Sequence, residues 1–496
     1  MAAIKSLMKD TAIYGLSSII GRFLNWCLVP LYTIVFPTEE YGVVTYVYSV
    51  VALVLIILTY GLETGFFRFA NHERWKDPMQ VYSTCLISLA ISSTAFVALV
   101  LAFLGPVTVW MECDNHPSFV VMMAVCVALD AFTSLPFVYL RYKKRPIRFA
   151  FLRLTNIGIN IGLNVFFILL CPALMKSSPG LIAWFYDPTF GIGYIFLANL
   201  IASITTFLMM IPELRGVRWN FCGKMWKEMI VYSMPLLVLG VAGVMNQTID
   251  KILYPKILHN DPSAMEGLGI YGANYKIAIV MVMFVQAFRF AYEPFIFAQS
   301  KEKGEDRNQA YCDAMKYFII FALLIFMGVM FYLNILKYFI SSRYFSGLSV
   351  VPIVMMAEFF FGVFFNLSLW YKLTDRTIWG MWFSLLGLAI TVGLNFALVP
   401  RMGYMGCAWA AFCCYGVMML TSYFVGRAKH PLRYPLKTIG AYTLLAAIVY
   451  VIGYYVVDTT WKWFNYIVRG LLLVAYGLIV VKREHIAIPG IRRFIH

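Results

Sequence analysis

Long apolar stretches separated by short polar ones dominate the chain. A helix needs roughly twenty apolar residues to cross about 30 Å of hydrocarbon, and we find fourteen stretches of that length. They lie at 11–36, 41–66, 80–104, 118–140, 149–172, 189–212, 229–255, 269–297, 313–336, 348–371, 378–399, 405–426, 438–456 and 464–481. The pattern predicts an all-α integral membrane protein with about fourteen transmembrane helices, the first too long for a cleaved signal peptide.

Part of the pattern occurs twice, at an offset of 230 residues. Residues that match at this offset, or within one residue of it, are Tyr41 and Tyr271, Gly42 and Gly272, Glu63 and Glu293, Tyr142-Lys143 and Tyr371-Lys372, and Gly162-Leu163-Asn164 and Gly393-Leu394-Asn395. Such a duplication moves each span six places along the chain, which preserves its orientation. We therefore predict two parallel six-helix repeats related by an axis along the membrane normal.

The repeat predicts three parts of the chain. Residues 1–228 form an N-terminal lobe with spans 1–6, and residues 229–437 form a C-terminal lobe with spans 7–12. Residues 438–496 hold spans 13 and 14, which have no partner in the repeat, and a cytoplasmic tail.

Composition agrees with a membrane protein and changes the meaning of the net charge. Of 496 residues 61% are hydrophobic and 13% charged, with a mean hydropathy of +0.77, whereas soluble proteins are about half apolar and a quarter charged. A net charge of +16 would suggest nucleic acid in a soluble chain, but most basic residues lie in alternate loops, such as 141–148 and 427–437. This bias predicts that both termini are cytoplasmic, and we predict no nucleic-acid partner.

Catalytic and metal-binding chemistry are not indicated. The loops are too short for a soluble catalytic domain, most of the ten cysteines fall in apolar runs, and the six histidines have unrelated spacings. We therefore expect no enzyme activity, no metal site and no cofactor.

Three stretches resemble one transporter family. They are TAIYGLSSIIGRFLN at 11–25, LGIYGANYKIA at 268–278 and GLNFALVPRMGYMGCAWA at 393–410. They resemble the polysaccharide transporter family, the O-antigen and capsule repeat-unit flippases of the multidrug/oligosaccharidyl-lipid/polysaccharide exporter superfamily. The resemblance implies a V-shaped pair of lobes in the bacterial inner membrane. Spans 1, 2, 7 and 8 would line a central cavity that opens alternately inward and outward.

Ionisable side chains within spans need an explanation, because a charge near the bilayer centre costs about 2.5–3.5 kcal/mol. Arg22 lies about 16 Å along the first span, with Asn25 on the same face. The near-equivalent position in the second repeat is Lys251, beside Asp250, and Asn246 precedes Asp250 by one turn. Two readings stay open for Arg22: binding of an anionic substrate, or an ion pair with Asp250 across the lobes.

Span 8 carries two further cations, Lys276 and Arg289, separated in depth by about 20 Å at 1.5 Å per residue. Arginine can hold a phosphate bidentately, whereas lysine acts as a point charge. The predicted substrate-binding residues of the central cavity are Arg22, Asn25, Asn246, Lys251, Lys276 and Arg289, with the two arginines as leading contacts.

Carboxylates at the cytoplasmic ends of spans 2 and 8 are candidate gate residues. Glu63 and Glu293 are repeat mates, and Glu293 follows Arg289 by four residues, so these two can share a helix face. Ion pairs of such carboxylates could close an inner gate in one state and open it in the other, or each could neutralise its neighbour permanently. The predicted gate or ion-pair residues are Glu63, Arg68, Asp250 and Glu293.

Two deep carboxylates, Asp130 in span 4 and Glu358 in span 10, are expected to lie away from the cavity centre. They could be buried against a serine, tyrosine or backbone partner, or they could couple transport to a proton. Four basic residues lie near predicted span ends, where snorkelling to the headgroups would be sufficient: Arg68, Arg153, Lys316 and Arg469.

The cations and the resemblance together favour a flippase. It would move an undecaprenyl-pyrophosphate-linked oligosaccharide repeat unit from the cytoplasmic to the periplasmic leaflet by alternating access, because basic groups can replace water around the phosphates. A lipid II flippase and a multidrug or cation antiporter of the same superfamily are the alternatives, and the excess of deep cations argues against the antiporter. Implied partners are the lipid-linked oligosaccharide, membrane lipids, a coupling proton or sodium ion, and polysaccharide polymerases or glycosyltransferases.

Overall fold

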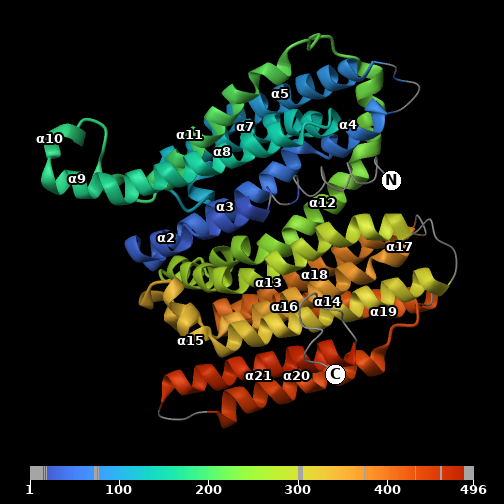
Figure 1. The fold of residues 1–496 in the computed structure, drawn as a ribbon. Coiled ribbons are helices and arrows are strands. Elements are labelled where there is room, and N and C mark those ends of the chain that lie inside the picture. The colour runs from blue at the N-terminus through green and yellow to red at the C-terminus, as the bar shows by residue number, and fades with distance from the viewer. Residues whose placement is uncertain are drawn as a thin grey trace. The chain divides into compact units, whose positions relative to one another are not determined.

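The computed structural model describes residues 15, 17, 19–71, 75, 77–299, 305–373, 376, 378–429, 432–457 and 461–484. Over these residues the chain consists of helices and short connections (Figure 1). The helices up to residue 257 are α2 (Val29–Val35), α3 (Thr38–Thr59), α4 (Leu62–Ala70), α5 (Pro78–Ala102), α6 (Leu104–Trp110), α7 (Pro117–Tyr142), α8 (Pro146–Val165), η1 (Phe166–Leu170), α9 (Cys171–Ser177), α10 (Pro179–Ile182), η2 (Pro188–Phe190), α11 (Gly193–Met210), η3 (Ile211–Leu214) and α12 (Gly223–Ile257).

The remaining helices continue in the same order. They are α13 (Ala264–Gln299), α14 (Glu305–Phe331), α15 (Leu333–Leu336), η4 (Lys337–Phe339), η5 (Ser342–Gly347), α16 (Val350–Leu367), α17 (Leu369–Leu373), α18 (Ile378–Met402), α19 (Tyr404–Lys429), α20 (Leu436–Val451), η6 (Ile452–Val456) and α21 (Lys462–Arg483).

The apolar pattern correctly predicted the fold class. Thirteen helices of the described chain are long and apolar enough to cross a membrane, and Ile19–Val35 is a shorter apolar helix. Part of the first predicted span, 11–36, lies outside the described residues. The chain is therefore an all-α, multi-pass membrane protein, since a helix satisfies its own backbone hydrogen bonds in lipid.

Local signals explain where several helices begin. Asp77 accepts a hydrogen bond from the backbone N–H of Met79 and caps α5. Proline stands at the first helical position of α5, α7 and α8, where the missing N–H has no intrahelical partner to lose.

Contacts divide the chain into two compact units. Unit 1 comprises Met1–Ala273 and Ser384–Ala410, and unit 2 comprises Asn274–Phe383 and Ala411–His496. In unit 1, α7 packs on α5 and α11, α11 packs on α8, and α3 packs on both α7 and α12. These unit boundaries differ from the predicted lobe boundaries at residues 228 and 437, because α12 and the start of α13 pack on α3 of the first repeat. The lobes themselves stay a prediction.

Repeat-equivalent residues share their local environments. Tyr41 and Tyr271 are both buried. Asn164 and Asn395 are also buried, and each side chain donates a hydrogen bond of 2.7 Å to the backbone carbonyl four residues earlier. These similarities are what a duplication predicts.

The last two membrane helices, α20 and α21, pack on α14 in unit 2. Arg469 of α21 is 9% exposed and donates to the carbonyl of Gly453 at 2.7 Å. It reaches two further carbonyls, at 3.5 Å on Phe331 and 3.3 Å on Val457. The prediction that Arg469 snorkels to headgroups was therefore wrong, because the π-helical turn η6 offers backbone carbonyls that this guanidinium satisfies.

A second polar contact ties α21 to α14. The Lys316 ammonium lies 2.5 Å from a carboxylate oxygen of Glu484, and the Tyr442 hydroxyl donates to the other oxygen at 2.7 Å. Lys316 therefore forms an internal ion pair instead of snorkelling. Burial alone would raise the pKa of Glu484, but the bonds from Lys316 and Tyr442 outweigh burial and lower that pKa.

Candidate functional site

A break in the second predicted span positions the first candidate residue. The helix α3 ends at Thr59, and Tyr60 and Gly61 follow with φ of 31° and 73°. Such a φ strains a tyrosine, and the Tyr60 hydroxyl is bonded to Ser88 at 2.5 Å, which also accepts from the Trp226 indole at 2.7 Å. The chain then resumes as the separate short helix α4, which carries Glu63.

Glu63 forms an ion pair with Arg141 at the end of α7. The closest N···O distance is 3.4 Å, and the side chains are 43% and 39% exposed. An exposed pair contributes little stability, so it can be broken and remade at small cost. The predicted gate partner Glu293 has a side chain outside the described residues.

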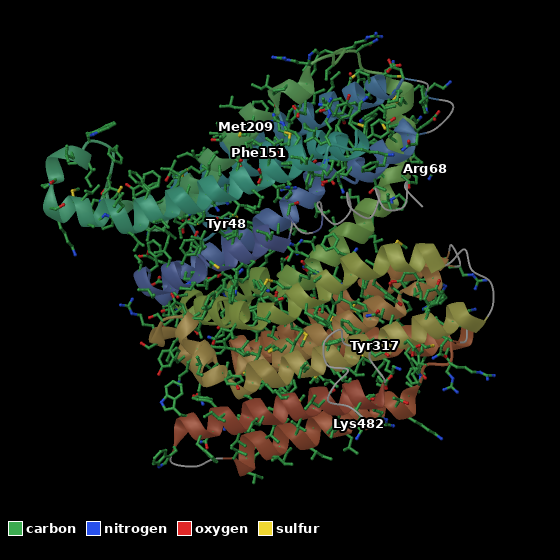
Figure 2. The ribbon with its side chains drawn as sticks, viewed as in Figure 1. Tyr48, Arg68, Phe151, Met209, Tyr317 and Lys482 are labelled. Carbon is green, nitrogen blue, oxygen red and sulfur yellow. The ribbon has the colours of Figure 1, made fainter. Side chains whose placement is uncertain are left out.

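Arg68, the other charged residue of α4, takes a different position. Its guanidinium carbon lies 4.1 Å from the ring centroid of Tyr232 in α12, a cation–π contact. Figure 2 shows Arg68 at the end of unit 1 that lies away from α9 and α10.

Arg153 of α8 is a central charge of unit 1, although the sequence suggested only snorkelling. Its guanidinium carbon lies 4.2 Å from the centroid of Phe137. It also interacts electrostatically with four charged groups, which are Asp130, Glu63, Arg141 and Arg22. Snorkelling of Arg153 to the headgroups stays a prediction, and α8 begins at residue 146, three residues before the predicted span.

Asp130 is held by neighbours on α7 and α11. The Ser203 hydroxyl donates to its carboxylate at 2.8 Å, and the Cys126 thiol lies 3.9 Å away. A serine is one of the partner types that the sequence suggested for this residue.

Arg22 and Asn25 have exposed side chains on the helix that begins at Ile19. We call Arg22, Glu63, Asp130, Arg141 and Arg153 the N-terminal charge cluster. Three guanidinium groups and two carboxylates leave this cluster with an excess of positive charge.

Lys251 lies in a different environment from the one predicted. It is 8% exposed, its ammonium lies 3.1 Å from the Asp250 carboxylate, and it donates to the Gln247 carbonyl at 2.9 Å. The Tyr271 hydroxyl donates to the same carboxylate at 2.7 Å. Lys251 is thus paired inside the protein, which differs from its predicted presentation to a cavity anion.

Asn246, one turn before Asp250, is also turned to the protein interior. Its amide donates to the Ser384 carbonyl at 3.0 Å, and its side chain is 6% exposed. It therefore packs against α18 in unit 1.

Two helices of unit 1 touch at their backbones. A Cβ on Gly42 of α3 would collide with the carbonyl of Met265, and a Cβ on Gly269 of α13 would collide with the carbonyl of Thr38. These glycines permit the close approach. We call this contact the glycine junction, and it joins the starts of helices that the repeat makes equivalent.

The candidate residues of unit 2 lie apart from one another along α13 and α16. Glu358 is 5% exposed and accepts a hydrogen bond from Tyr275 at 2.8 Å. Lys276 is half-buried, whereas Arg289 is exposed with its guanidinium carbon 4.6 Å from the ring centroid of Phe365.

Comparison with known proteins identifies the family of this chain. A family model described as a polysaccharide biosynthesis protein matches residues 7–298. The chain belongs to this family. The family predicted from the sequence is thereby confirmed, and a search of curated proteins finds no match.

Solved structures similar to this family member are transporters. The lipid II flippase MurJ, in an inward closed conformation, has a TM-score of 0.75 at 14% identity and covers 95% of this chain and 99% of its own. An inward-facing multidrug resistance MATE transporter of the MOP superfamily has a TM-score of 0.68 at 15% identity, covering 84% and 97%. The outward-facing conformation of a multidrug resistance MATE transporter of the same superfamily has 0.58 at 14%, covering 85% and 95%. The polysaccharide biosynthesis family member therefore has the fold of these transporters.

The sequence did not predict two residues of the N-terminal charge cluster, Arg141 and Arg153. Arg141 was counted among the basic residues that set topology, and Arg153 was placed at a span end. The only signal for either was a carboxylate without an obvious partner in a neighbouring span.

Proposed function

We propose that this transporter moves a lipid-linked oligosaccharide, carried on undecaprenyl pyrophosphate, from the cytoplasmic to the periplasmic leaflet of a bacterial inner membrane. The observation that carries the proposal is the N-terminal charge cluster, where Arg22 and Arg153 are exposed and positive charge exceeds negative. The family description and the similarity to a lipid II flippase support a substrate of this class.

The chemistry of the headgroup suits these residues. Phosphate oxygens cannot enter hydrocarbon without replacement of their hydration, and a guanidinium replaces water with paired N–H donors. Arg22 and Arg153 would hold the pyrophosphate, with Asn25 donating to a phosphate or sugar oxygen.

The carboxylates supply a release mechanism. A bound pyrophosphate would compete with Glu63 and Asp130 for Arg153, so binding would loosen the exposed pair between Glu63 and Arg141. Movement of α4 at the Tyr60–Gly61 break would open the cytoplasmic side, and separation of the glycine junction would open the other side. Asp130 and Glu358 are the proposed acceptors of a coupling proton, and a sodium ion is the alternative.

A lipid II flippase is the second candidate, and the similarity to MurJ favours it. The same cluster would serve either pyrophosphate, so the sugar decides between them. A cation antiporter is less consistent with the cluster, because an excess of arginine repels a cationic substrate.

The test is transport of fluorescent undecaprenyl-pyrophosphate oligosaccharide and of lipid II by the full chain in proteoliposomes. We expect transport of the oligosaccharide, loss of transport with Arg22→Ala and Arg153→Ala, and partial retention with Arg22→Lys. Normal transport by both alanine variants at wild-type abundance would exclude the cluster, and preference for lipid II would establish the second candidate.

A further inference from the structure

The helix formed by α8, η1 and α9 is longer than a membrane requires. It runs for 32 residues from Pro146 to Ser177, which is about 48 Å at 1.5 Å per residue. A hydrocarbon core is only about 30 Å thick. Figure 1 shows α9 and α10 at the far end of this helix, beyond the end of α11.

The neighbouring helix α11 shows how far the end projects. Tyr194, in the first turn of α11, has its ring centroid 4.9 Å from that of Phe167 and packs in one cluster with Cys171. The α8–α9 helix continues from Cys171 to Ser177, which adds about 9 Å. A headgroup layer is roughly 5–7 Å thick on each side of the hydrocarbon, so the projecting turns have the length to lie within it.

The projecting segment turns back as a hairpin with apolar side chains on its outside. Leu181 is 68% exposed, Trp184 83% and Phe185 37%, whereas Ile182 is buried beneath them. The Trp184 indole N–H donates to the Leu181 carbonyl at 3.0 Å, which fixes the ring in its exposed position.

The charge of the hairpin points to lipid. From residue 166 to residue 186 the one ionised side chain is Lys176, and it is exposed. Asp187, at the base, accepts from the backbone N–H of Thr189 at 2.9 Å and from its hydroxyl at 2.7 Å. Tryptophan, leucine and phenylalanine are typical of segments that lie in a membrane interface, and a single lysine beside them can contact a lipid phosphate.

We propose that residues 171–187 form a membrane-surface anchor. They lie in the headgroup layer of the leaflet farther from Arg148, with Leu181, Trp184 and Phe185 at the acyl boundary and Lys176 on lipid phosphates. The anchor holds α8, and therefore Arg153, at a fixed depth. The inference requires only that the chain crosses the membrane, and does not depend on the proposed substrate.

The experiment places an environment-sensitive NBD fluorophore on Ala183→Cys, next to Trp184, in the full chain in phosphatidylglycerol–phosphatidylcholine vesicles. Asn115→Cys, in the exposed loop before α7, is the matched control, and the labelled parent chain corrects for native cysteines. We expect blue-shifted emission at 183, quenching by nitroxide lipids and protection from iodide, with the reverse at 115. Trp184→Ser should increase the quenching of the 183 label by iodide. Lys176→Gln should weaken its quenching by nitroxide lipids only in vesicles that contain the anionic lipid.

Two results would overturn the anchor. Equal iodide quenching at 183 and 115 would show a tip in water, free for a protein or glycan. Protection of 183 from both iodide and nitroxide lipids would show that protein covers it, such as a second copy of the chain. Both results concern only where the 183 label lies, and neither depends on transport. A failure of the membrane-surface anchor can therefore be distinguished from a failure of the proposed function.

Discussion

At the scale of single residues, partners decide what a buried charge does. Arg22 and Lys251 occupy near-equivalent repeat positions, yet Arg22 is exposed within the N-terminal charge cluster, whereas Lys251 is buried against Asp250. We infer that Lys251 stabilises the protein, and that the cluster is the part of unit 1 available to an anion.

The first prediction tests the pair of Asp250 and Lys251. Asp250→Asn leaves the lysine uncompensated, so the free energy of unfolding should fall by roughly 3–5 kcal/mol. The double variant Asp250→Leu, Lys251→Met replaces both charges with apolar groups and should recover most of that loss. The measurement is the Tm and abundance of the purified protein.

Arg22→Ala is the matched control, because its side chain is exposed and its removal should leave the Tm nearly unchanged. A fall in Tm for Arg22→Ala as large as that for Asp250→Asn would mean that Arg22 also has a structural role.

At the scale of helices, close backbone contacts and buried polar ties set the packing. The glycine junction joins α3 to α13, while Arg469 and the pair of Lys316 and Glu484 fasten α21 to α14. Both kinds of contact tolerate few substitutions, because neither a backbone carbonyl nor a buried charge can move aside easily.

The second prediction concerns the glycine junction. Gly269→Ala places a methyl group against the Thr38 carbonyl, and overpacking of this kind costs about 1–3 kcal/mol. The control is Gly393→Ala, where nothing lies within 4 Å of the added Cβ, and where alanine should favour the helix by up to about 1 kcal/mol. Thermal unfolding in detergent should separate the two variants, and equal Tm values would show that α3 and α13 do not touch at this point.

The third prediction is a pH dependence of the attachment of α21. The folded-state pKa of Glu484 is lowered, because the bonds from Lys316 and Tyr442 outweigh burial. Its stabilising contribution is therefore complete above the ordinary glutamate pKa of about 4.3, and is lost as the pH falls through the folded value. Protection of the α20 and α21 amides from hydrogen exchange, relative to the intrinsic exchange rate at each pH, should therefore fall in the wild type as Glu484 becomes protonated.

Glu484→Gln supplies the control for this effect. Its α20 and α21 amides should be less protected than those of the wild type at neutral pH, and their protection, relative to the intrinsic exchange rate, should change little on acidification. Wild-type protection in α21 that does not fall on acidification would contradict the assignment.

At the scale of the whole molecule, the chain is a multi-pass transporter fold with an internal repeat in its sequence. The positive-inside bias predicts the orientation, and the function in the proposed direction depends on it. The fourth prediction is that an impermeant thiol reagent outside intact cells labels Asn115→Cys and not Lys144→Cys. Labelling of position 144 alone would show that the orientation is the reverse of the predicted one. Labelling of both positions only after lysis would show that the α6–α7 loop does not lie outside the cell.

The sequence by itself determined the helices and the family. An apolar run of about twenty residues forms a helix in lipid, because a helix satisfies each backbone N–H and C=O group within the segment. The positions of the spans can therefore be predicted from the local composition of the chain. The stretches at 11–25, 268–278 and 393–410 indicated the family, and a family model that matches residues 7–298 confirms it.

Only the tertiary structure decided which charges meet. Glu63 and Arg141 are 78 residues apart, and Lys316 and Glu484 are 168 apart, so no periodicity in the sequence relates them. Spacing does not predict the pair of Asp250 and Lys251 either, because adjacent residues of a helix point to different faces, and partners on different helices depend on packing angle and on where each helix begins. Arg153 of α8 is an example, because the carboxylates that interact with it, Asp130 and Glu63, lie on α7 and α4.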